Sequence, residues 1–477
     1  MPQPIPLPIG TYRLPNPTPS CRRLVNCFAE EAPPDRPKGQ PVVLRRAPGI
    51  APFADTEEPE VRGGITMPDG TLYVVAGASM YRVGQDGTLT QLSGTAIGGN
   101  GPVRVATNGT DIVVCPGDGT GYYTSDGSTV GQINDPVFTQ GGGGADPVFI
   151  DQYIVFRRRN SAQFFNTGLN SLTFNALDFA SAEGAPGYLV GLLANNRELV
   201  LVKEHSTELW YNAGNPSGSP FSRSPSGFKE APGCGASLSL CTQDNAPFMV
   251  ASDRTVRRLG SVWEKVSHPG IEGILQQMTQ ISDCIALPYT QEGHLFIAFT
   301  FRHAGRTLVY DVTTREWHER DSIINTASLG YWRPSCILQA YGKQIVGDSQ
   351  SGKLGILDPD THEEWGEPQR VDITWQPVYA NRNRVFVYAF ELHVGAGVGL
   401  ITGQGSDPLC TLFVSSDDGQ TWRAKAVRTL GRIGEYRRRV RWTCLGSHHA
   451  FVPRVQITDP VPVFVVDALI DAEGGAS

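Results

Sequence analysis

The sequence predicts an all-β protein, and three observations point to that class. The 477 residues include 54 glycines and 35 prolines, a share well above the usual total of about 12%. Charged residues make up only 18% of the chain, while hydrophobic residues make up 40%. Long amphipathic helices need many Ala, Leu, Glu and Lys residues and few glycines, so a helical bundle is excluded. The third observation is a repeat of apolar hairpins.

The repeat occupies the middle of the chain. Each copy is an apolar strand, a polar turn and a second apolar strand. The seven hairpins span residues 71–83, 111–123, 152–165, 198–211, 247–259, 294–311 and 344–358. Successive copies start 40 to 50 residues apart, a period typical of propeller blades. We therefore expect a six- or seven-bladed β-propeller over residues 61–367. An unrelated run of antiparallel hairpins is the alternative.

The two ends of the chain differ from the repeat. Residues 1–60 are rich in proline, which lacks the N–H that a strand ladder needs. We expect an extended N-terminal arm with few regular strands, lying over its own chain or over a neighbour. Residues 368–477 alternate apolar and polar side chains in several segments. This pattern favours a separate C-terminal β-sandwich-like module.

Charge and cysteine usage restrict the function classes. The net charge is −7, which argues against coating nucleic acid with the whole surface but allows a local basic lining. The nine cysteines are scattered without a C-x-x-C pair, so we expect reduced, mostly buried thiols. The first residues lack the basic and apolar regions of a signal peptide. The longest apolar run, residues 294–301, is far shorter than the ~20 residues of a membrane-spanning helix.

Motifs for catalysis or cofactor binding are absent. The sequence contains no P-loop, no G-x-S-x-G nucleophile elbow and no H-E-x-x-H pair. Residues 141–144 are four glycines, which indicate a flexible hinge or a tight passage. His448 and His449 lack a spaced third ligand for a metal. We therefore predict no catalytic, cofactor-binding or metal-binding residue.

Residues 415–422 match the Asp-box pattern S-x-D-x-G-x-x-W. We expect a tight hairpin in which Asp417 accepts backbone N–H groups, Gly419 takes a positive φ and Trp422 packs beneath the turn. A single copy outside the repeat favours a structural role.

Two arginine triplets are the candidate interaction residues. They are Arg157, Arg158 and Arg159, and Arg437, Arg438 and Arg439. Arg441 follows two residues later, and a strand would place Arg437, Arg439 and Arg441 on one face. Arginine binds phosphate by bidentate, charge-assisted hydrogen bonds without base specificity. The triplets therefore predict a DNA-channel lining or a protein interface, with salt bridges or a solvated face as the alternative.

The sequence as a whole resembles a known family, the packaged-DNA stabilisation proteins of short-tailed bacteriophages. These are also called tail hub, nozzle or head-closure proteins. The resemblance begins with residues 24–28 (LVNCF) and 43–50 (VLRRAPGI). It continues through residues 61–64, 72–77, 80–81, 108–109, 208–211, 308–311, 317, 417–419, 437–439 and 442. Each piece is short, and the specificity lies in their common order along the chain.

The resemblance implies a virion structural protein rather than an enzyme. Members form a hexameric ring below the portal and adaptor rings, retain packaged double-stranded DNA and later let it pass. A needle or plug and tailspikes or fibres are the other expected neighbours. The resemblance implies assembly in the host cytoplasm and a final place in the phage tail, with no membrane span. The acidic composition and the long glycine stretches of this chain depart from the family.

Two other interpretations remain open. One is a carbohydrate-binding or glycoside-hydrolysing propeller of the Asp-box type, suggested by the Asp box and by Trp210, Trp263, Trp317 and Trp332 as surface aromatics. The other is a scaffold propeller without a viral context.

Overall fold

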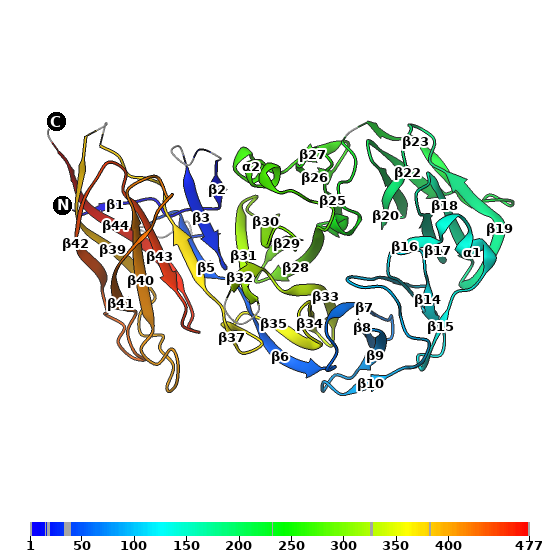
Figure 1. Cartoon of the computed structure of the whole chain (residues 1–477), viewed down its shortest axis with the longest axis horizontal. Helices are drawn as coiled ribbons and strands as arrows, with labels where there is room; N and C mark the ends of the chain where they lie inside the picture. Colours follow the sequence, from blue (N-terminus) through cyan, green and yellow to red (C-terminus); the bar gives the residue numbers. More distant parts are fainter. Residues whose placement is uncertain are drawn as a thin grey trace.

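A computed structural model describes residues 2–14, 16, 20–32, 40–230, 232–324, 328–380 and 383–475. Strands dominate these residues, and helix is confined to α1 (Pro136–Thr139), α2 (Pro269–Gln277) and the 3-10 turns η1 (Gln140–Gly142) and η2 (Ser237–Ser239). Figure 1 shows a ring of sheets on one side and a smaller β module on the other. The all-β prediction is confirmed.

The ring is a propeller, and the described residues form seven blades. Blade 1 contains β7 (Val61–Thr66), β8 (Leu72–Ala76), β9 (Ser79–Val83) and β10 (Leu89–Gln91). Blade 2 contains β12 (Arg104–Thr107), β13 (Ile112–Cys115), β14 (Tyr122–Thr124) and β15 (Thr129–Gln132), with the short β11 (Ser93–Gly94) added. Blade 3 contains β16 (Gly144–Ile150), β17 (Tyr153–Arg158), β18 (Gln163–Gly168) and β19 (Ser171–Ser181). Blade 4 contains β20 (Leu189–Asn195), β21 (Glu198–Lys203), β22 (Ser206–Asn212) and β23 (Phe221–Glu230).

The remaining blades complete the circle. Blade 5 contains β24 (Cys241–Gln243), β25 (Ala246–Val250), β26 (Val256–Leu259) and β27 (Trp263–Lys265). Blade 6 contains β28 (Ile285–Gln291), β29 (His294–Phe301), β30 (Arg306–Asp311) and β31 (Trp317–Ile324), with β32 (Ser328–Tyr331) paired to β31. Blade 7 contains β33 (Pro334–Ala340), β34 (Lys343–Asp348), β35 (Lys353–Asp358) and β6 (Gly49–Asp55), extended by β36 (Glu363–Glu364) and β37 (Glu367–Pro368). Each predicted hairpin is the middle pair of strands of one blade.

The blades are held together by apolar layers between neighbouring sheets. Seven buried clusters fill the seven inter-blade spaces. Because a blade is covered on both faces, its middle strands are apolar on both sides. In β8 and β25, for example, every residue is buried. This two-sided burial explains why these hairpins are visible as apolar runs in the sequence.

Residues 1–60 contain more regular structure than expected. β6 is the outer strand of blade 7, pairs with β35 and so closes the ring with an N-terminal strand. β3 (Cys21–Val25), β4 (Cys27–Glu31) and β5 (Val42–Arg46) also join sheets, as do the short β1 (Gln3–Pro4) and β2 (Tyr12–Arg13). The expectation of few regular strands is wrong because β3, β4 and β5 contain no proline. Pro52 of β6 lies beside a bulge, where a missing N–H is tolerated.

The C-terminal module is a sandwich of two sheets. One sheet has the order β4, β5, β44 (Phe464–Gly474), β39 (Val385–Val394) and β42 (Val440–His448), with β1 on β44. The other contains β3, β38 (Val371–Thr374), β43 (Val452–Ile457), β40 (Leu409–Ser415) and β41 (Arg423–Thr429). One apolar core that includes Trp375, Phe390 and Trp442 lies between the sheets.

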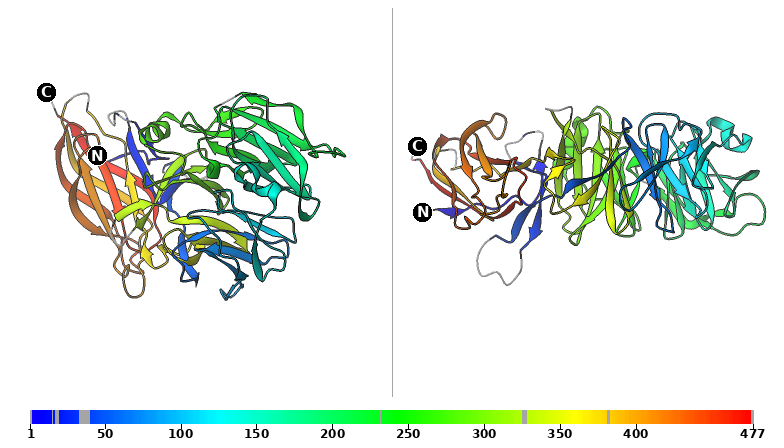
Figure 2. Two further views of the ribbon diagram at one scale, coloured as in Figure 1. Left: turned by 45° about the vertical axis from the view of Figure 1, so that its right-hand side comes forward. Right: turned by 90° about the horizontal axis from the view of Figure 1, so that it is seen from below.

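The propeller and the sandwich share one sheet. β3 pairs with β31 of blade 6 on one side and with β38 of the sandwich on the other. Figure 2 shows the two modules side by side with the N-terminal strands between them. Ion pairs reinforce the junction, for example the two bonds of 2.7 and 2.8 Å from Arg23 to Glu319. The modules are therefore continuous through a hydrogen-bonded ladder.

Local geometry confirms the prediction that most thiols are buried, and it shows how several turns are made. Gly70, Gly87 and Gly127 each follow an aspartate in a turn and have positive φ. Seven of the nine free cysteines are buried, Cys336 is half-buried and Cys444 is exposed. Burial raises the pKa of Cys21 and of Cys336 to about 11. Within the described ranges, no helix has both the length and the apolar character needed to cross a membrane.

Candidate interaction surfaces

The first arginine triplet lies inside the propeller. Arg157 on β17 donates through Nε to Asp146 at 2.5 Å. Ser237 of η2 donates to the same carboxylate at 3.2 Å. Asp146 therefore links blade 3 to the η2 turn, which leads into blade 5.

Arg158 and Arg159 are also used within the chain. The Arg158 guanidinium donates to the backbone oxygen of Gln140 and, at 3.3 Å, to that of Val137. It lies 4.6 Å from the ring centroid of Phe165, and burial lowers its pKa. Arg159 donates to the backbone oxygen of Asp118 in blade 2. These contacts hold α1 and a loop of blade 2 against blade 3.

The glycine run beside this triplet is a tight passage. Gly143 has a φ of +83°, and a Cβ built there would overlap the backbone oxygen of Gly119. Since Gly119 belongs to blade 2, the glycines allow two backbones of neighbouring blades to touch.

The propeller axis is crossed by a side chain. Arg104 comes from β12, the inner strand of blade 2, and donates to the backbone oxygens of Ser237 at 3.0 Å and Leu240 at 3.2 Å. Blades 3 and 4 lie between these two elements, so the Arg104 side chain spans the centre of the ring. A cavity of about 190 Å³ lined by Leu238 and inner-strand residues remains beside it. Arg104 and the η2 turn therefore occupy part of the axis.

The second triplet belongs to an exposed basic segment, residues 423–441. This segment has eight arginines and lysines and one acidic residue, Glu435. It covers β41, a loop and the start of β42, which lie together at one edge of the sandwich. Arg428 donates through Nε to the backbone oxygen of Arg441 at 2.8 Å, and Trp442 donates through Nε1 to that of Ala426 at 2.5 Å.

Part of the positive charge of the basic segment is neutralised. Arg439 makes a bidentate pair with Glu391, with two distances of 2.7 Å. Arg441 lies 3.8 Å from the same carboxylate, and Arg432 lies 3.3 Å from Asp407. Among the described residues, no ion pair involves the other five basic side chains, those of Arg423, Lys425, Arg428, Arg437 and Arg438.

The expected strand geometry of the second triplet is corrected in one respect. β42 begins at Val440, so Arg437 and Arg438 lie in the turn before the strand. Gly431 and Gly434 have positive φ and reverse the chain there. Arg439 and Arg441 still face the same way, because both reach Glu391.

The rim of the basic segment is partly apolar. Tyr436 is 74% exposed and Ile433 is 59% exposed. Exposed aromatic side chains next to arginines are typical of interaction surfaces.

The Asp box has the predicted hairpin geometry. Asp417 accepts hydrogen bonds from the backbone N–H groups of Gln420 and Thr421 at 3.1 and 2.8 Å. Burial raises the pKa of the Asp417 carboxyl, but the bonds from Ser415, Thr421 and Gln420 lower it to about 2. Gly419 has a φ of +85°, and a Cβ there would lie 3.5 Å from the Trp422 ring. The hydrogen-bonding groups of the Asp box therefore stabilise its own turn.

The surface aromatics expected for the carbohydrate-active alternative are mostly internal. Trp263, Trp317 and Trp332 are buried, and Trp210 is half-buried. Their expected exposure is wrong because each supports a blade, as when Trp317 packs 5.0 Å from Tyr310. In the part of the chain that the structure describes, no cluster of His, Cys, Asp and Glu side chains fits a metal ion.

Two family models match almost the whole chain and place it among bacteriophage structural proteins. A β-propeller model matches residues 4–362, and a β-sandwich model matches residues 370–473. Both models describe bacteriophage P22 Gp10, and the chain belongs to that family. The propeller-plus-sandwich fold and the family resemblance are thus confirmed, and the protein is a phage structural protein.

Solved structures with a similar fold are more distant. A streptogramin B lyase is 13% identical, with a TM-score of 0.44 over 64% of this chain and 96% of its own. A catalytically inactive virginiamycin B lyase from Staphylococcus aureus with quinupristin is 10% identical, with a TM-score of 0.45 over 65% and 98%. The WD40 propeller domain of Doa1 is 9% identical, with a TM-score of 0.42 over 65% and 96%. No curated protein matches the sequence.

Proposed function

We propose that this protein is a hub or nozzle component of a short phage tail. Copies form a hexameric ring below the portal and adaptor rings, retain the packaged DNA and enclose the channel through which it leaves. The ring also contacts a tail needle or plug and tailspikes or fibres. It assembles in the host cytoplasm, acts in the virion and has no enzymatic role.

The observation that carries this proposal is the basic segment, residues 423–441. A chain with a net charge of −7 concentrates eight cationic side chains there. Guanidinium groups bind phosphates regardless of base sequence. Pairing of Arg439 and Arg441 with Glu391 reduces the charge that DNA meets. A moderate charge suits a channel, because tight phosphate contacts would slow transit.

The crossed axis supports a channel enclosed by several copies. Arg104 reaches from blade 2 to the η2 turn inside each propeller, and the proposal places the duplex between subunits. Heterologous contacts that close by rotation generate such a ring. The rigid junction through β3 suits this role, since it keeps the sandwich at a set angle to the propeller.

Salt-dependent DNA binding by the full chain tests the channel assignment. We expect the logarithm of the association constant for a short duplex to fall linearly with the logarithm of salt concentration. Replacing Arg437 and Arg438 together by alanine should lower that slope by about two, because each phosphate contact contributes about one. Fluorescence anisotropy on several unrelated duplex sequences measures both the slope and the lack of sequence preference.

Arg197 provides a matched control. Its side chain is 83% exposed on blade 4, so Arg197→Ala removes a surface charge far from the basic segment and should leave the slope unchanged. Equal slopes for the Arg437/Arg438 double variant and the unmodified protein would contradict DNA contact at this segment. Native mass spectrometry of the full chain tests the ring, and a stable monomer at all concentrations and with the adaptor would contradict it.

A further inference from the structure

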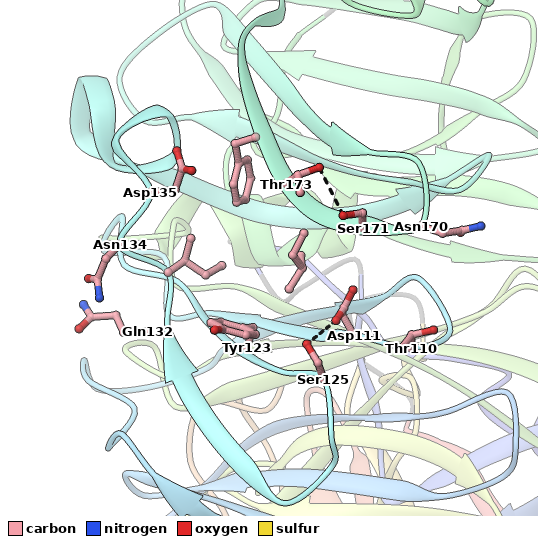
Figure 3. Close-up of a pocket in the computed structure, with 13 residues that line it drawn as sticks. Thr110, Asp111, Tyr123, Ser125, Gln132, Asn134, Asp135, Asn170, Ser171 and Thr173 are labelled. Atoms are coloured by element: carbon pink, nitrogen blue, oxygen red, sulfur yellow. Dashed lines mark hydrogen bonds between the residues drawn. The ribbon is translucent and has the colours of Figure 1, made fainter.

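A groove opens between blades 2 and 3, away from the sandwich. Its volume is about 570 Å³, within the range of about 300–1,000 Å³ of small-molecule sites. Blade 2 contributes Tyr123 and Gln132, and the chain leaving that blade contributes Asn134. Blade 3 contributes Asn170 and Phe174 from the β18–β19 hairpin. Figure 3 shows the polar side chains of both blades lining the two sides of the groove.

The lining combines aromatic rings with uncharged hydrogen-bonding groups. Tyr123 and Phe174 are half-buried, so part of each ring is open to the groove. Amide groups come from Gln132, Asn134 and Asn170, and among the described residues no hydrogen bond to their side chains is present. These amides are therefore free to donate to and accept from a ligand.

Charged groups contribute little to the groove. No lysine or arginine lines it, and its two carboxylates are already engaged. Asp111 accepts from Ser125, and Asp135 accepts from the backbone N–H of Val137 at 2.8 Å. A nucleic acid or another polyanion would find no cation here. The chemistry of the groove suits a neutral ligand that offers many hydroxyl groups.

The groove is held in a defined shape. Phe174 packs 5.6 Å from Phe138 of α1, and Phe138 packs 5.3 Å from Phe156 of β17. Arg158 fixes α1 from the other side through its bonds to Gln140 and Val137. Since both walls are set by blade packing, binding requires little ordering of the protein.

We propose that this groove is a binding site for a neutral oligosaccharide or polysaccharide. Tyr123 and Phe174 stack on the apolar faces of sugar rings, while Gln132, Asn134 and Asn170 hydrogen-bond to the hydroxyl groups. A sugar has both surfaces that the groove offers: flat C–H faces and a ring of hydroxyls that donate and accept. A peptide is the competing occupant that the test includes, since Ile133 and Leu172 also line the groove. This site does not depend on the hub ring or on DNA contact.

Calorimetric titration of the full chain tests the assignment. The probes are neutral hexasaccharides of glucose, mannose, galactose and rhamnose, a neutral polysaccharide released from the host surface, and an uncharged peptide of similar length. We expect at least one saccharide to bind with a dissociation constant of about 0.1–1 mM. Binding by the host polysaccharide alone would identify a cell-surface source, whereas binding by a simple hexasaccharide would show that a single sugar type suffices.

Substitutions locate the binding. Tyr123→Ala should weaken it about tenfold, and Tyr123→Phe should preserve it, because the ring is retained. Asn134→Ala with Asn170→Gly changes two exposed side chains and should weaken it several-fold while the fold is kept, because glycine tolerates the positive φ of residue 170. Tyr388→Ala, on the exposed face of the sandwich, is the matched control and should bind normally.

Three results would overturn the proposal. One is binding of the peptide without binding of any saccharide. Another is equal affinity of the unmodified protein and the Asn134/Asn170 double variant. The third is dissociation constants above about 10 mM for every saccharide, since that is no better than chance contact.

Discussion

Asp372 at the junction of propeller and sandwich offers a sharp test of how the two modules are joined. Its side chain is fully buried, and Arg454 donates to it through Nε at 2.8 and 2.9 Å. Arg370 lies 3.6 Å away and also pairs with Asp321. Asp372→Ala leaves two cations without this carboxylate inside the junction.

The loss of folding free energy in Asp372→Ala depends on how deeply the ion pairs are buried. Breaking a buried ion pair by removing one partner costs about 3–5 kcal/mol. The Arg454 side chain is 19% exposed and that of Arg370 is 13% exposed, so both guanidiniums keep some contact with water. We therefore expect Asp372→Ala to lower the free energy of unfolding by about 3 kcal/mol, the lower end of that range. The exposed pair of Arg432 and Asp407 is the matched control, and Asp407→Ala should cost less than about 1 kcal/mol.

Urea unfolding followed by tryptophan fluorescence measures the difference. Trp375 and Trp442 lie in the sandwich core and report on that module. Because two modules need not unfold together, the midpoint of the sandwich transition is the quantity compared. The double variant Asp372→Ala with Arg454→Met should recover part of the loss, since it removes the stranded cation. If Asp372→Ala and Asp407→Ala shift the midpoint equally, the buried network does not stabilise the junction.

Three further outcomes follow from single residues. Burial lowers the pKa of His318 to about 3, whereas the unfolded chain takes up this proton below about pH 6.5. Stability is therefore lost as the pH falls, by about 2 kcal/mol at pH ~5, and His318→Phe should reduce that loss in urea titrations. Gly143→Ala should lower the melting temperature more than Gly109→Ala, because both glycines have positive φ but only the first faces a backbone oxygen; equal shifts would contradict the tight passage. Ile50→Ala in the ring-closing strand should cost about 2–5 kcal/mol, measured by thermal unfolding, while the 84% exposed Ile401→Ala should be neutral.

The propeller was predictable because its signal is local. Both middle strands of a blade are covered on two faces, so β8 and β25 read as short apolar runs between turn residues. The strand that completes the ring has no such signal. β6 pairs with β35, about three hundred residues further along the chain, and such a pairing leaves no periodicity to detect. The sequence alone therefore did not decide whether the propeller has six or seven blades.

The two arginine triplets show where local patterns stop being informative. Arg157, Arg158 and Arg159 face a carboxylate and backbone carbonyls of adjacent segments. Backbone carbonyls carry no sequence signature, so the internal role of this triplet could not be read from the residues. The triplet beginning at Arg437 reaches the surface because its glycine-rich loop projects from the sandwich. The groove between blades 2 and 3 was missed for a related reason, since its lining comes from separate turns without a motif.

The sheet order of the sandwich also has a consequence for biosynthesis. β4 and β5 leave the ribosome among the first segments, yet β44, which pairs with β5, is the last strand to be made. The two partners of β3, β31 and β38, are likewise translated much later than β3 itself. The last propeller strand ends at Pro368, but the sandwich is complete only after β44, so a prematurely terminated polypeptide lacks the finished sandwich. A polypeptide that stops before β44 therefore leaves one edge of β5 without its partner strand.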